Sequence, residues 1–311
     1  MGQKGESVNK TLMGAIAVVV ASLLWSLDGF LRQSLYSLPP AVVVFWEHVF
    51  GFVVLLPIII FTLREFRKLS GKQWAAIALA ALLSGALGTI LYTAALGQIG
   101  YIDFSVVVLL QQLQPVFAIS AAGILLKEPI TKRFLGLALA ALLAGYFVSF
   151  PNLTITTTSS GAVMAALLAL GAAASWGIST VFSKYALKDI NFLSITAIRF
   201  GLTPLFALLM VTALGQSSQL MSISIPQWRT IALITFSTGL VALAIYYFGL
   251  KRIPASRSTI LELTWPLSAA VVGYLFLGDR LTPTQWAGAA ALVVIMWLVE
   301  SDAQAMAKID K

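Results

Sequence analysis

The sequence predicts an all-α integral membrane protein with ten transmembrane helices, arranged as two inverted repeats of five helices each. Three observations lead to this fold class: an apolar composition, ten separate apolar stretches, and a similarity between the two halves of the chain. Of the 311 residues, 59% are hydrophobic and 10% are charged, whereas an average soluble protein has about 25% charged residues. So few polar side chains cannot cover a water-soluble globule, which excludes a soluble enzyme, a nucleic-acid-binding module and a disordered scaffold.

Ten apolar stretches are candidates to cross the bilayer, whose core takes about 20 helical residues to span. In order along the chain they are residues 12–35, 40–62, 74–97, 104–126, 134–150, 161–186, 192–214, 228–250, 257–277 and 284–299. Turn-forming residues separate them, such as Pro39-Pro40 after the first stretch and Pro151-Asn152 after the fifth. The first stretch continues to Asp28 without a cleavage site of small residues, so we expect a retained helix and not a cleaved signal.

The positions of lysine and arginine predict how the chain is oriented in the membrane. Sixteen of the twenty basic residues fall in the terminal segments and in every second connection, three fall on the opposite side, and Arg199 lies within a span. Cytoplasmic loops are enriched in lysine and arginine. We therefore expect a multi-pass protein of the cytoplasmic (plasma) membrane with both termini in the cytoplasm.

The two halves of the chain resemble each other at a nearly constant spacing. Four pairs are 151 or 154 residues apart: Trp25 and Trp176, His48 and Arg199, Pro115 and Pro266, and Tyr92 and Tyr246. Because each half has an odd number of spans, the second half would enter the membrane upside down relative to the first. We therefore expect residues 1–150 and 151–311 to form two inverted repeats within one membrane domain. Inverted repeats are typical of secondary transporters, which bind their substrate near the membrane midplane between the repeats.

Short motifs at corresponding places in the two halves strengthen the transport interpretation. They are Trp25-Ser26 and Ser175-Trp176-Gly177, Leu91-Tyr92-Thr93-Ala94-Ala95-Leu96 and Ile245-Tyr246-Tyr247-Phe248-Gly249-Leu250, Gln114-Pro115-Val116-Phe117 and Trp265-Pro266, and Lys127-Glu128-Pro129 and Gly278-Asp279-Arg280. In the order and spacing of these motifs, over nearly the whole chain, the sequence resembles the drug/metabolite transporter superfamily, in its ten-helix EamA-type branch. The resemblance implies transport of a small molecule, commonly export, for solutes as diverse as amino acids, their metabolites and nucleotide sugars. The sequence departs from the family at Glu47-His48, where members usually carry an arginine in the second helix.

Charged residues inside spans are costly, and each needs a physical reason. Asp28 and Arg32 lie four residues apart, so they share a helix face and either pair with each other or bind a ligand at the outer mouth. Glu47 and His48 are neighbours that point about 100° apart on a helix, so only one of them faces a cavity. His48 corresponds to Arg199 in the repeat, which favours His48 as the cavity residue. Histidine titrates near physiological pH and suits proton coupling; a hydrogen-bonded packing residue is the alternative.

Glu262 and Gln111 occupy corresponding positions, each four residues before a proline of its span, Pro266 or Pro115. The repeat thus places a charged side chain in the inner half of the membrane and a neutral one in the outer half. We expect Glu262 to bind a cationic or amino group of the solute, or a coupling proton. The alternative is a buried ion pair between Glu262 and Arg199.

Two prolines and a set of aromatic residues complete the candidate site. Pro115 and Pro266 lie inside their spans, where a proline removes a backbone hydrogen bond and kinks the helix. We expect these two helices to act as cavity walls or gating elements, with a fixed structural bend as the alternative. Aromatic residues on the motif-bearing helices suit a pocket for an apolar or aromatic solute, although packing is again the alternative. They are Trp25, Tyr92, Trp176, Tyr246 and Trp265.

As a whole the sequence predicts a secondary transporter or facilitator that moves small amphipathic metabolites, amino acids or related compounds, mainly outward by alternating access. The predicted substrate-binding residues are Trp25, Asp28, His48, Tyr92, Gln111, Trp176, Arg199, Tyr246 and Glu262, of which Glu262, Asp28 and His48 are the candidates for proton coupling. The expected partners are the solute, the lipid bilayer and a proton, with no nucleic acid. With no cysteine and one histidine, neither a metal site nor another cofactor is expected.

Other classes of function remain as alternatives to a secondary transporter. A membrane-embedded enzyme could use the intramembrane Asp, Glu and His side chains as acid–base groups, although we do not expect an enzyme. A passive channel for small solutes is a second alternative. An ATP-driven pump is not expected, because the chain has no nucleotide-binding loop of the G-x-x-x-x-G-K-[ST] type.

Overall fold

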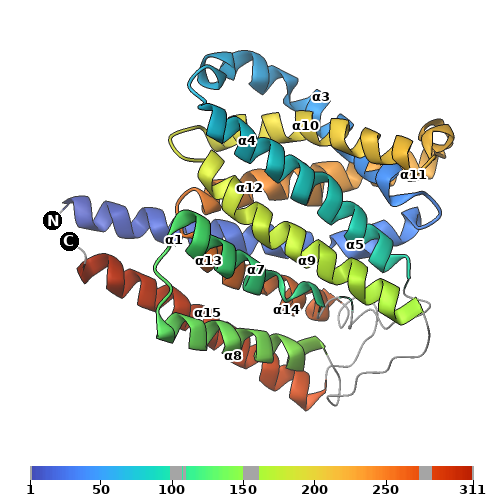
Figure 1. The fold of residues 1–311 in the computed structure, drawn as a ribbon. Helices are drawn as coiled ribbons and strands as arrows, with labels where there is room; N and C mark the ends of the chain where they lie inside the picture. The colour runs from blue at the N-terminus through green and yellow to red at the C-terminus, as the bar shows by residue number, and fades with distance from the viewer. Residues whose placement is uncertain (1, 99–106, 108–109, 150–160, 273–281, 310–311) are drawn as a thin grey trace.

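The computed structural model of the chain describes residues 2–98, 107, 110–149, 161–272 and 282–309. Within these residues all regular structure is helical (Figure 1). Among the described residues, six helical segments are long and apolar enough to cross a membrane: Asn9–Arg32, Pro40–Phe66, Gly71–Leu96, Val163–Ala186, Phe192–Ala213 and Ile225–Leu250. Shorter apolar helices cover Gln114–Leu126 and Pro283–Val299. The prediction of an all-α integral membrane protein is confirmed.

The first half of the chain contains ten helical elements in its described part, of which seven are α-helices, one is a 3₁₀ helix and two are π-helices. They are α1 (Gly2–Trp25), α2 (Asp28–Arg32), the 3₁₀ helix η1 (Gln33–Leu35), α3 (Pro40–Phe66), α4 (Gly71–Ala80), the π-helix η2 (Ala81–Gly88), α5 (Thr89–Leu96), α7 (Gln114–Ala121), the π-helix η3 (Ala122–Leu126) and α8 (Lys132–Ser149). The second half contains α9 (Gly161–Ala186), α10 (Phe192–Ala213), the 3₁₀ helix η5 (Ser217–Met221), α11 (Ile225–Ile234), the π-helix η6 (Thr235–Gly239), α12 (Leu240–Leu250), α13 (Ala255–Leu261), α14 (Thr264–Val272) and α15 (Pro283–Ile309).

The third and eighth spans begin in the same way. Ser70 and Gln73 form a capping box at the start of α4, in which the Ser70 amide donates to Gln73 Oε1 at 3.1 Å. Ser224 and Gln227, 154 residues further on, form the same box at the start of α11, with a distance of 2.9 Å. Such a box satisfies amides that the first helical turn leaves without an acceptor. Each of these two spans then passes through a π-helical segment, η2 or η6, and π-helical turns are frequent at functional sites.

Three spans are interrupted by non-helical turns. The first breaks between α1 and α2, the ninth breaks between α13 and α14, and α7 begins directly after a turn at Gln112 and Leu113. A backbone hydrogen bond between residues three apart closes the turn before α7 and the turn between α13 and α14. The Leu113 amide donates to the Leu110 carbonyl, and the Leu263 amide donates to the Ile260 carbonyl, each at 3.2 Å.

These interruptions change the interpretation of the two prolines. Pro115 and Pro266 were expected to kink continuous helices, but each lies in the first turn of a helix that begins anew, α7 or α14. Backbone amides in a first turn have no acceptor within the helix, so proline costs no hydrogen bond there.

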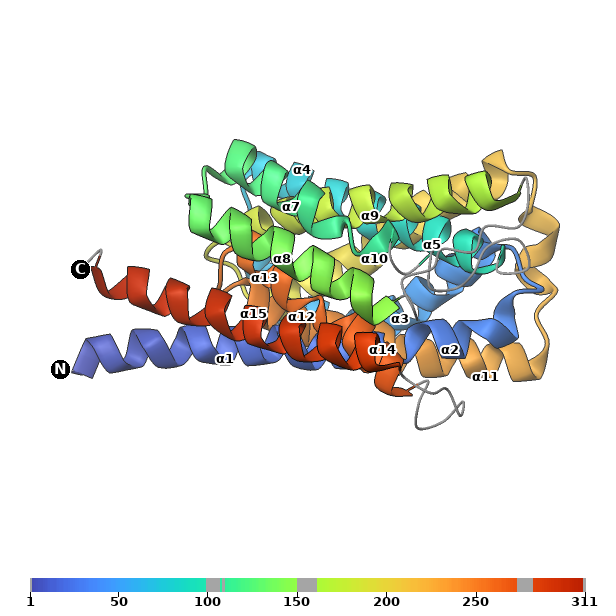
Figure 2. The same ribbon diagram turned by 90° about the horizontal axis from the view of Figure 1, so that it is seen from below.

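Helices from the two halves pack against each other in pairs. The main pairs are α3 with α10, α1 with α12, α7 with α9, and α8 with α15. Figure 1 shows α8 and α15 side by side along one edge of the bundle, and Figures 1 and 2 both show the two termini at the same end. The outward surface carries large apolar side chains, including Phe61, 86% exposed, and Trp297, 66% exposed. Such a surface is the one a lipid bilayer covers.

Candidate functional site

A cavity with about 190 Å³ of room for water-sized molecules lies between helices of both halves. All nine predicted binding residues line it: Trp25, Asp28, His48, Tyr92, Gln111, Trp176, Arg199, Tyr246 and Glu262. Pro115 also lines the cavity, while the side chain of Pro266 lies outside the described residues. The sequence therefore selected residues that meet in one space, and their role in binding stays a prediction.

One buried charge cluster joins the first, second, third and eighth spans. Arg32 pairs with Asp28 one turn earlier on α2, and its Nη2 donates to Glu47 Oε2 on α3 at 2.9 Å. The hydroxyl of Thr238, in η6, donates to Asp28 Oδ1 at 2.6 Å, and Thr93 on α5 lies 3.5 Å from Arg32 Nη1. Arg32 is 2% exposed and Glu47 is 4% exposed. The ion pair of Asp28 with Arg32, one of the two interpretations of these residues, is therefore formed. The same guanidinium also binds a second carboxylate, that of Glu47.

His48 and Arg199 lie on facing helices and have different partners. The Nδ1 atom of His48 lies 2.9 Å from the Val44 carbonyl one turn back, and its ring packs against Phe200 with centroids 4.9 Å apart. A ring nitrogen that faces a carbonyl must carry the proton, so the other nitrogen of the neutral ring is an acceptor. Arg199 donates from Nη1 to the hydroxyl of Tyr247 at 2.9 Å, and its guanidinium lies over the Tyr247 ring.

Glu262 lies at the break between α13 and α14 and accepts hydrogen bonds from neutral donors. The Tyr246 hydroxyl donates to Oε1 of Glu262 at 2.7 Å, and the side-chain Nε2 of Gln114 donates to Oε2 at 2.7 Å. Ser258 is 3.4 Å from Oε1. The alternative pairing with Arg199 is not formed, and no ion pair of Glu262 is found in the described part of the chain. Glu262 is partly buried, and a carboxylate that is withdrawn from water without a counter-ion is costly; its predicted role in binding a proton or a solute stays a prediction.

Two aromatic pairs face the cavity and each joins one half of the chain to the other. Trp25 and Tyr246 have ring centroids 5.1 Å apart at an interplanar angle of 54°. Tyr92 and Trp176, their counterparts in the repeat, are 5.3 Å apart at 57°.

The indole nitrogens of the cavity satisfy backbone carbonyls at irregular helix segments. Trp265 Nε1 donates to the Trp25 carbonyl at the end of α1 at 3.0 Å. Trp176 Nε1 donates to the Ser84 carbonyl in η2 at 3.2 Å. Aromatic side chains thus both line the cavity and stabilise its interrupted walls.

Several buried polar atoms of the cavity have no hydrogen-bond partner within the described residues. They are the Tyr92 hydroxyl, Gln111 Nε2, Arg199 Nε and Thr259 Oγ1. Buried polar groups are nearly always paired in folded proteins, because leaving one unpaired costs about 1–3 kcal/mol. Groups of this kind around a cavity can be satisfied by a bound solute or by water.

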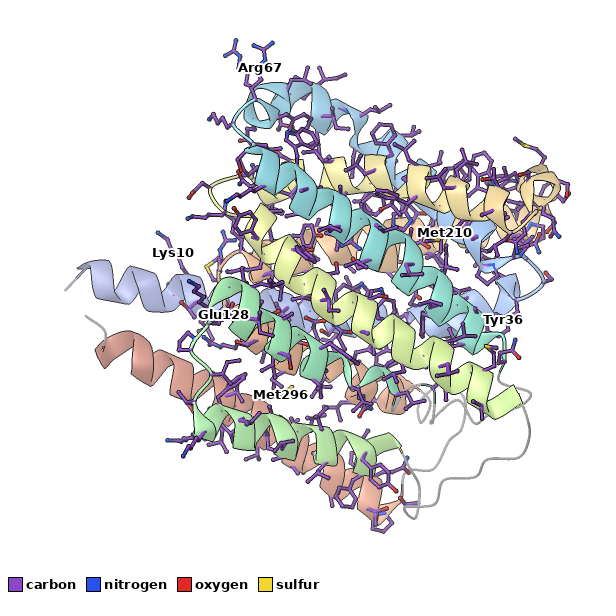
Figure 3. All side chains as sticks on the ribbon, viewed as in Figure 1. Lys10, Tyr36, Arg67, Glu128, Met210 and Met296 are labelled. Atoms are coloured by element: carbon purple, nitrogen blue, oxygen red, sulfur yellow. The ribbon has the colours of Figure 1, made fainter. Side chains whose placement is uncertain are left out.

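Glu128 closes one end of the bundle over the start of α13. Its Oε1 accepts the Ala255 amide at 2.7 Å, and its Oε2 accepts the amide of Ser256 at 3.0 Å and the Ser256 hydroxyl. A carboxylate at a helix N-terminus is favoured both by free amides and by the helix dipole. Figure 3 shows Glu128 toward the same end of the molecule as Lys10, and Tyr36 toward the opposite end.

Two cavity residues with clear contacts were missed among the predicted binding residues. Gln114 binds Glu262, and Thr238 binds Asp28. A signal for Thr238 existed, because it precedes Gly239 just as Ser84 precedes Gly85 154 residues earlier, and Ser84 also lines the cavity. Gln114 directly precedes Pro115, but a sequence does not show which carboxylate an amide reaches. No group of three or more His, Cys, Asp or Glu side chains that could hold a metal is found among the described residues.

Comparisons with known proteins agree on one family. The description "EamA-like transporter family" applies to residues 12–150 and again to residues 163–300. A protein named riboflavin transporter ImpX, from Fusobacterium nucleatum subsp. nucleatum, is 34% identical over 292 residues, which cover 91% of this chain and 96% of that protein. The uncharacterized transporter YwfM of Bacillus subtilis is 28% identical over 183 residues, 58% of each chain.

A solved crystal structure shares the fold at low sequence identity. It superposes with a TM-score of 0.68 at 16% identity and covers 94% of this chain and 97% of its own. This match shows a shared arrangement of the helices. The chain therefore belongs to the EamA-like transporter family, whose members are ten-helix membrane proteins that transport small molecules.

Proposed function

We propose that this chain is a secondary transporter that carries riboflavin or a closely related flavin across the cytoplasmic membrane by alternating access. The observation that carries the proposal is the match to the riboflavin transporter of Fusobacterium nucleatum, which extends over nearly the full length of both chains at 34% identity. The cavity supports it with chemistry that a flavin needs. This proposal narrows the broad class of amphipathic metabolites expected from the sequence.

The cavity suits the two parts of a flavin. A flat, largely apolar ring system is matched by the aromatic pairs Trp25–Tyr246 and Tyr92–Trp176, because aromatic rings stack favourably on aromatic side chains. A chain of hydroxyl groups and the polar edge of the ring need hydrogen-bond partners, which the unpartnered polar atoms around the cavity supply.

Alternating access is supported by the internal repeat. The capping boxes at Ser70 and Ser224, the π-helical segments η2 and η6, and the two aromatic pairs recur at equivalent positions of the two halves. Two similar halves in opposite orientations can exchange conformations, so that one arrangement opens the cavity to each side. With basic residues concentrated on one side, both termini lie in the cytoplasm in this proposal.

A second candidate, export of amino acids, is favoured by one observation. Arg199 and Glu262 both line the cavity, carry opposite charges and are not paired with each other. Such an arrangement can bind the carboxylate and the ammonium group of one zwitterion.

Flux through purified protein in liposomes tests both candidates. Vesicles are given radiolabelled riboflavin outside or inside, and a panel of radiolabelled amino acids in parallel. Saturable riboflavin flux that unlabelled riboflavin competes away supports the proposal, and flux that never saturates indicates a channel. Saturable flux of amino acids without riboflavin flux overturns the flavin proposal in favour of the second candidate.

A further inference from the structure

Arg199 lines the cavity with one terminal nitrogen of its guanidinium already bound. Its Nη1 donates to the Tyr247 hydroxyl at 2.9 Å, and its guanidinium carbon lies 5.6 Å from the centre of the Tyr247 ring. The Arg199 side chain is largely buried, at 8% exposure for the residue. Because a guanidinium is rigid and planar, this double contact with Tyr247 also fixes the direction in which its other N–H groups point.

Tyr247 is in turn held from behind, away from the cavity. It is 0% exposed and does not line the cavity, so a solute meets Arg199 and not this ring. The Tyr247 hydroxyl accepts from Arg199 and has one proton of its own, for which Ser183 Oγ is an acceptor at 2.9 Å. The tyrosine therefore orients the guanidinium without touching the solute.

The opposite edge of the same guanidinium, formed by Nε and Nη2, is unused within the described part of the chain. Nε is buried there without a hydrogen-bond partner, and neither nitrogen is bonded or ion-paired to a described residue. Buried polar groups are nearly always paired. Nε and Nη2 present two parallel N–H donors in one plane. This edge of Arg199 therefore suits a partner with two acceptor atoms side by side.

Riboflavin, the solute of the proposed function, has such acceptor pairs on its ring system. Each of its two ring carbonyl oxygens lies beside a ring nitrogen that accepts hydrogen bonds, and both atoms of such a pair lie in the plane of the ring. The hydroxyl groups of the ribityl chain rotate independently, so the chain holds no two acceptors in one plane. Riboflavin also has no anionic group at neutral pH that would compete for the guanidinium.

From this arrangement we infer that the Nε–Nη2 edge of Arg199 binds the flavin ring through a carbonyl oxygen and the neighbouring ring nitrogen, with Tyr247 as the positioning residue. The inference rests on the proposed function. It gives the bound solute an orientation, in which the polar edge of the ring faces α10 and the ribityl chain extends away from it. Two parallel hydrogen bonds from a charged donor are strong and geometrically specific, so Arg199 also recognises this part of the flavin.

Vibrational spectroscopy of riboflavin bound to the purified full-length protein tests the contact directly. Riboflavin that is isotopically labelled at one or the other ring carbonyl identifies the two carbonyl stretching bands. A hydrogen bond lowers the stretching frequency of the carbonyl that accepts it. We expect one band of bound riboflavin to lie below its position in dimethyl sulfoxide, a solvent that donates no hydrogen bond. Two bands at their positions in this solvent overturn the inference.

Variants of Arg199 assign the contact to its guanidinium. Arg199→Met removes the donor pair and keeps a long unbranched side chain. We expect the lowered band to move up, and the dissociation constant for riboflavin to rise by about tenfold or more in a fluorescence titration, because hydrogen bonds to charged groups contribute that much. Arg199→Lys keeps the charge but offers no planar pair of donors, so it should also weaken binding. Unchanged affinity in Arg199→Lys would show that charge alone matters and overturn the inference.

Two further variants separate positioning from a general loss of structure. Tyr247→Phe keeps the ring under the guanidinium and deletes the hydroxyl that binds Nη1, so it should move the same carbonyl band by less than Arg199→Met does. An unmoved band would overturn the positioning role. Arg252→Lys is the matched control, because Arg252 also stacks on an aromatic ring, that of Phe248, and donates Nη1 to a carbonyl, but does not line the cavity. It should leave both band and affinity unchanged.

A comparison of ligands distinguishes the ring from other groups that could reach Arg199. Lumiflavin has the same ring system with a methyl group in place of the ribityl chain, so Arg199→Met should weaken lumiflavin and riboflavin by the same factor. A loss for riboflavin alone would place the chain at Arg199 and overturn the inference. Riboflavin 5′-phosphate offers its phosphate as a rival partner. If Arg199→Met weakens this ester and spares riboflavin, Arg199 binds phosphate and the inference is wrong.

The outcomes also separate the inference from the function on which it rests. Riboflavin binding with unshifted carbonyl bands overturns the inference and leaves the flavin proposal standing. A lowered band that persists in Arg199→Met shows that another donor makes the contact and overturns the assignment to Arg199. If riboflavin does not bind the unaltered protein at all, the inference and the proposed function fail together. The spectrum of the unaltered protein tests the contact even if a variant does not fold.

Discussion

Tyr246 donates a hydrogen bond of 2.7 Å to the carboxylate of Glu262 and so joins α12 to the break between α13 and α14. Gln114, the first residue of α7, holds the other oxygen of the same carboxylate at 2.7 Å. One carboxylate therefore connects two interrupted spans and the eighth span at the wall of the cavity. Whatever occupies this carboxylate, a proton or a solute hydroxyl, acts on the junction of three helices at once.

Removal of the tyrosine hydroxyl should weaken flavin binding. Tyr246→Phe keeps the ring that packs on Trp25 but deletes the donor to Glu262. Hydrogen bonds to charged groups contribute about 1.5–3 kcal/mol, so we expect the dissociation constant for riboflavin to rise by about tenfold or more in a fluorescence titration. Tyr185→Phe alters a tyrosine outside the cavity, 37% exposed, and should not change it. An unchanged constant in Tyr246→Phe would show that Glu262 does not need this donor.

Proton coupling is tested at the same carboxylate. Glu262→Gln retains the shape of the side chain and an oxygen that accepts from Tyr246, but it cannot exchange a proton. We expect this variant to lose the stimulation of flux by an imposed pH gradient in proteoliposomes, while flux down a solute gradient persists. Glu262→Asp, which keeps the acid, should retain the stimulation. If Glu262→Gln is still fully stimulated, coupling belongs to another group, with Asp28 and His48 the next to examine.

Glu128 should contribute to stability from outside the cavity. Glu128→Ala removes the acceptor of the first amides of α13, Ala255 and Ser256. Losing a helix cap costs about 0.5–2 kcal/mol, so we expect the midpoint of thermal unfolding in detergent to fall by a few degrees. Lys132→Ala, an exposed change close by in the sequence, serves as the control. Equal midpoints for the two variants would mean that water replaces this cap at no cost.

Close packing of α9 on α7 makes a further prediction. A Cβ atom at Gly177 would lie 2.6 Å from the Gln114 carbonyl oxygen and 2.9 Å from Phe117 Cβ. Gly177→Ala should therefore push the two helices apart and cost about 1–3 kcal/mol, seen as a lower unfolding midpoint and reduced flavin binding. Gly136→Ala is the matched control, because a Cβ there meets no atom within 4 Å. An unfolding midpoint for Gly177→Ala equal to that of the control would contradict the packing.

The sequence predicted the helical membrane fold because apolar length and composition depend only on the bilayer. It also led to side chains that share a cavity, since a charge or a repeated aromatic within an apolar stretch stands out against its neighbours. Trp25 and Tyr246 illustrate the limit of this reasoning. Each was found from its motif, but their contact across the two halves depends on how the helices pack, which no local pattern encodes.

The interruptions of the helices were outside what the sequence could show. Pro115 indicated an irregularity, yet it could not tell a kink in a continuous helix from a turn that ends before the proline. The neutral partners of Glu262 were not foreseen either: charge suggested Arg199 as one alternative, whereas the structure supplies Tyr246 and Gln114. Neutral donors are common in any sequence, so they give no signal of which one reaches a given carboxylate.

The buried cluster of Arg32 has a consequence for how the protein is assembled in the membrane. Asp28, Arg32 and Glu47 all belong to the first two spans, so their mutual ion pairs can form before any later span is synthesised. Thr238, the other partner of Asp28, enters the bilayer only with the eighth span. The hairpin of the first two spans can thus remain in the bilayer with most of its charge already paired. When the eighth span inserts, Thr238 adds the last hydrogen bond of the cluster and links the second half of the chain to the first.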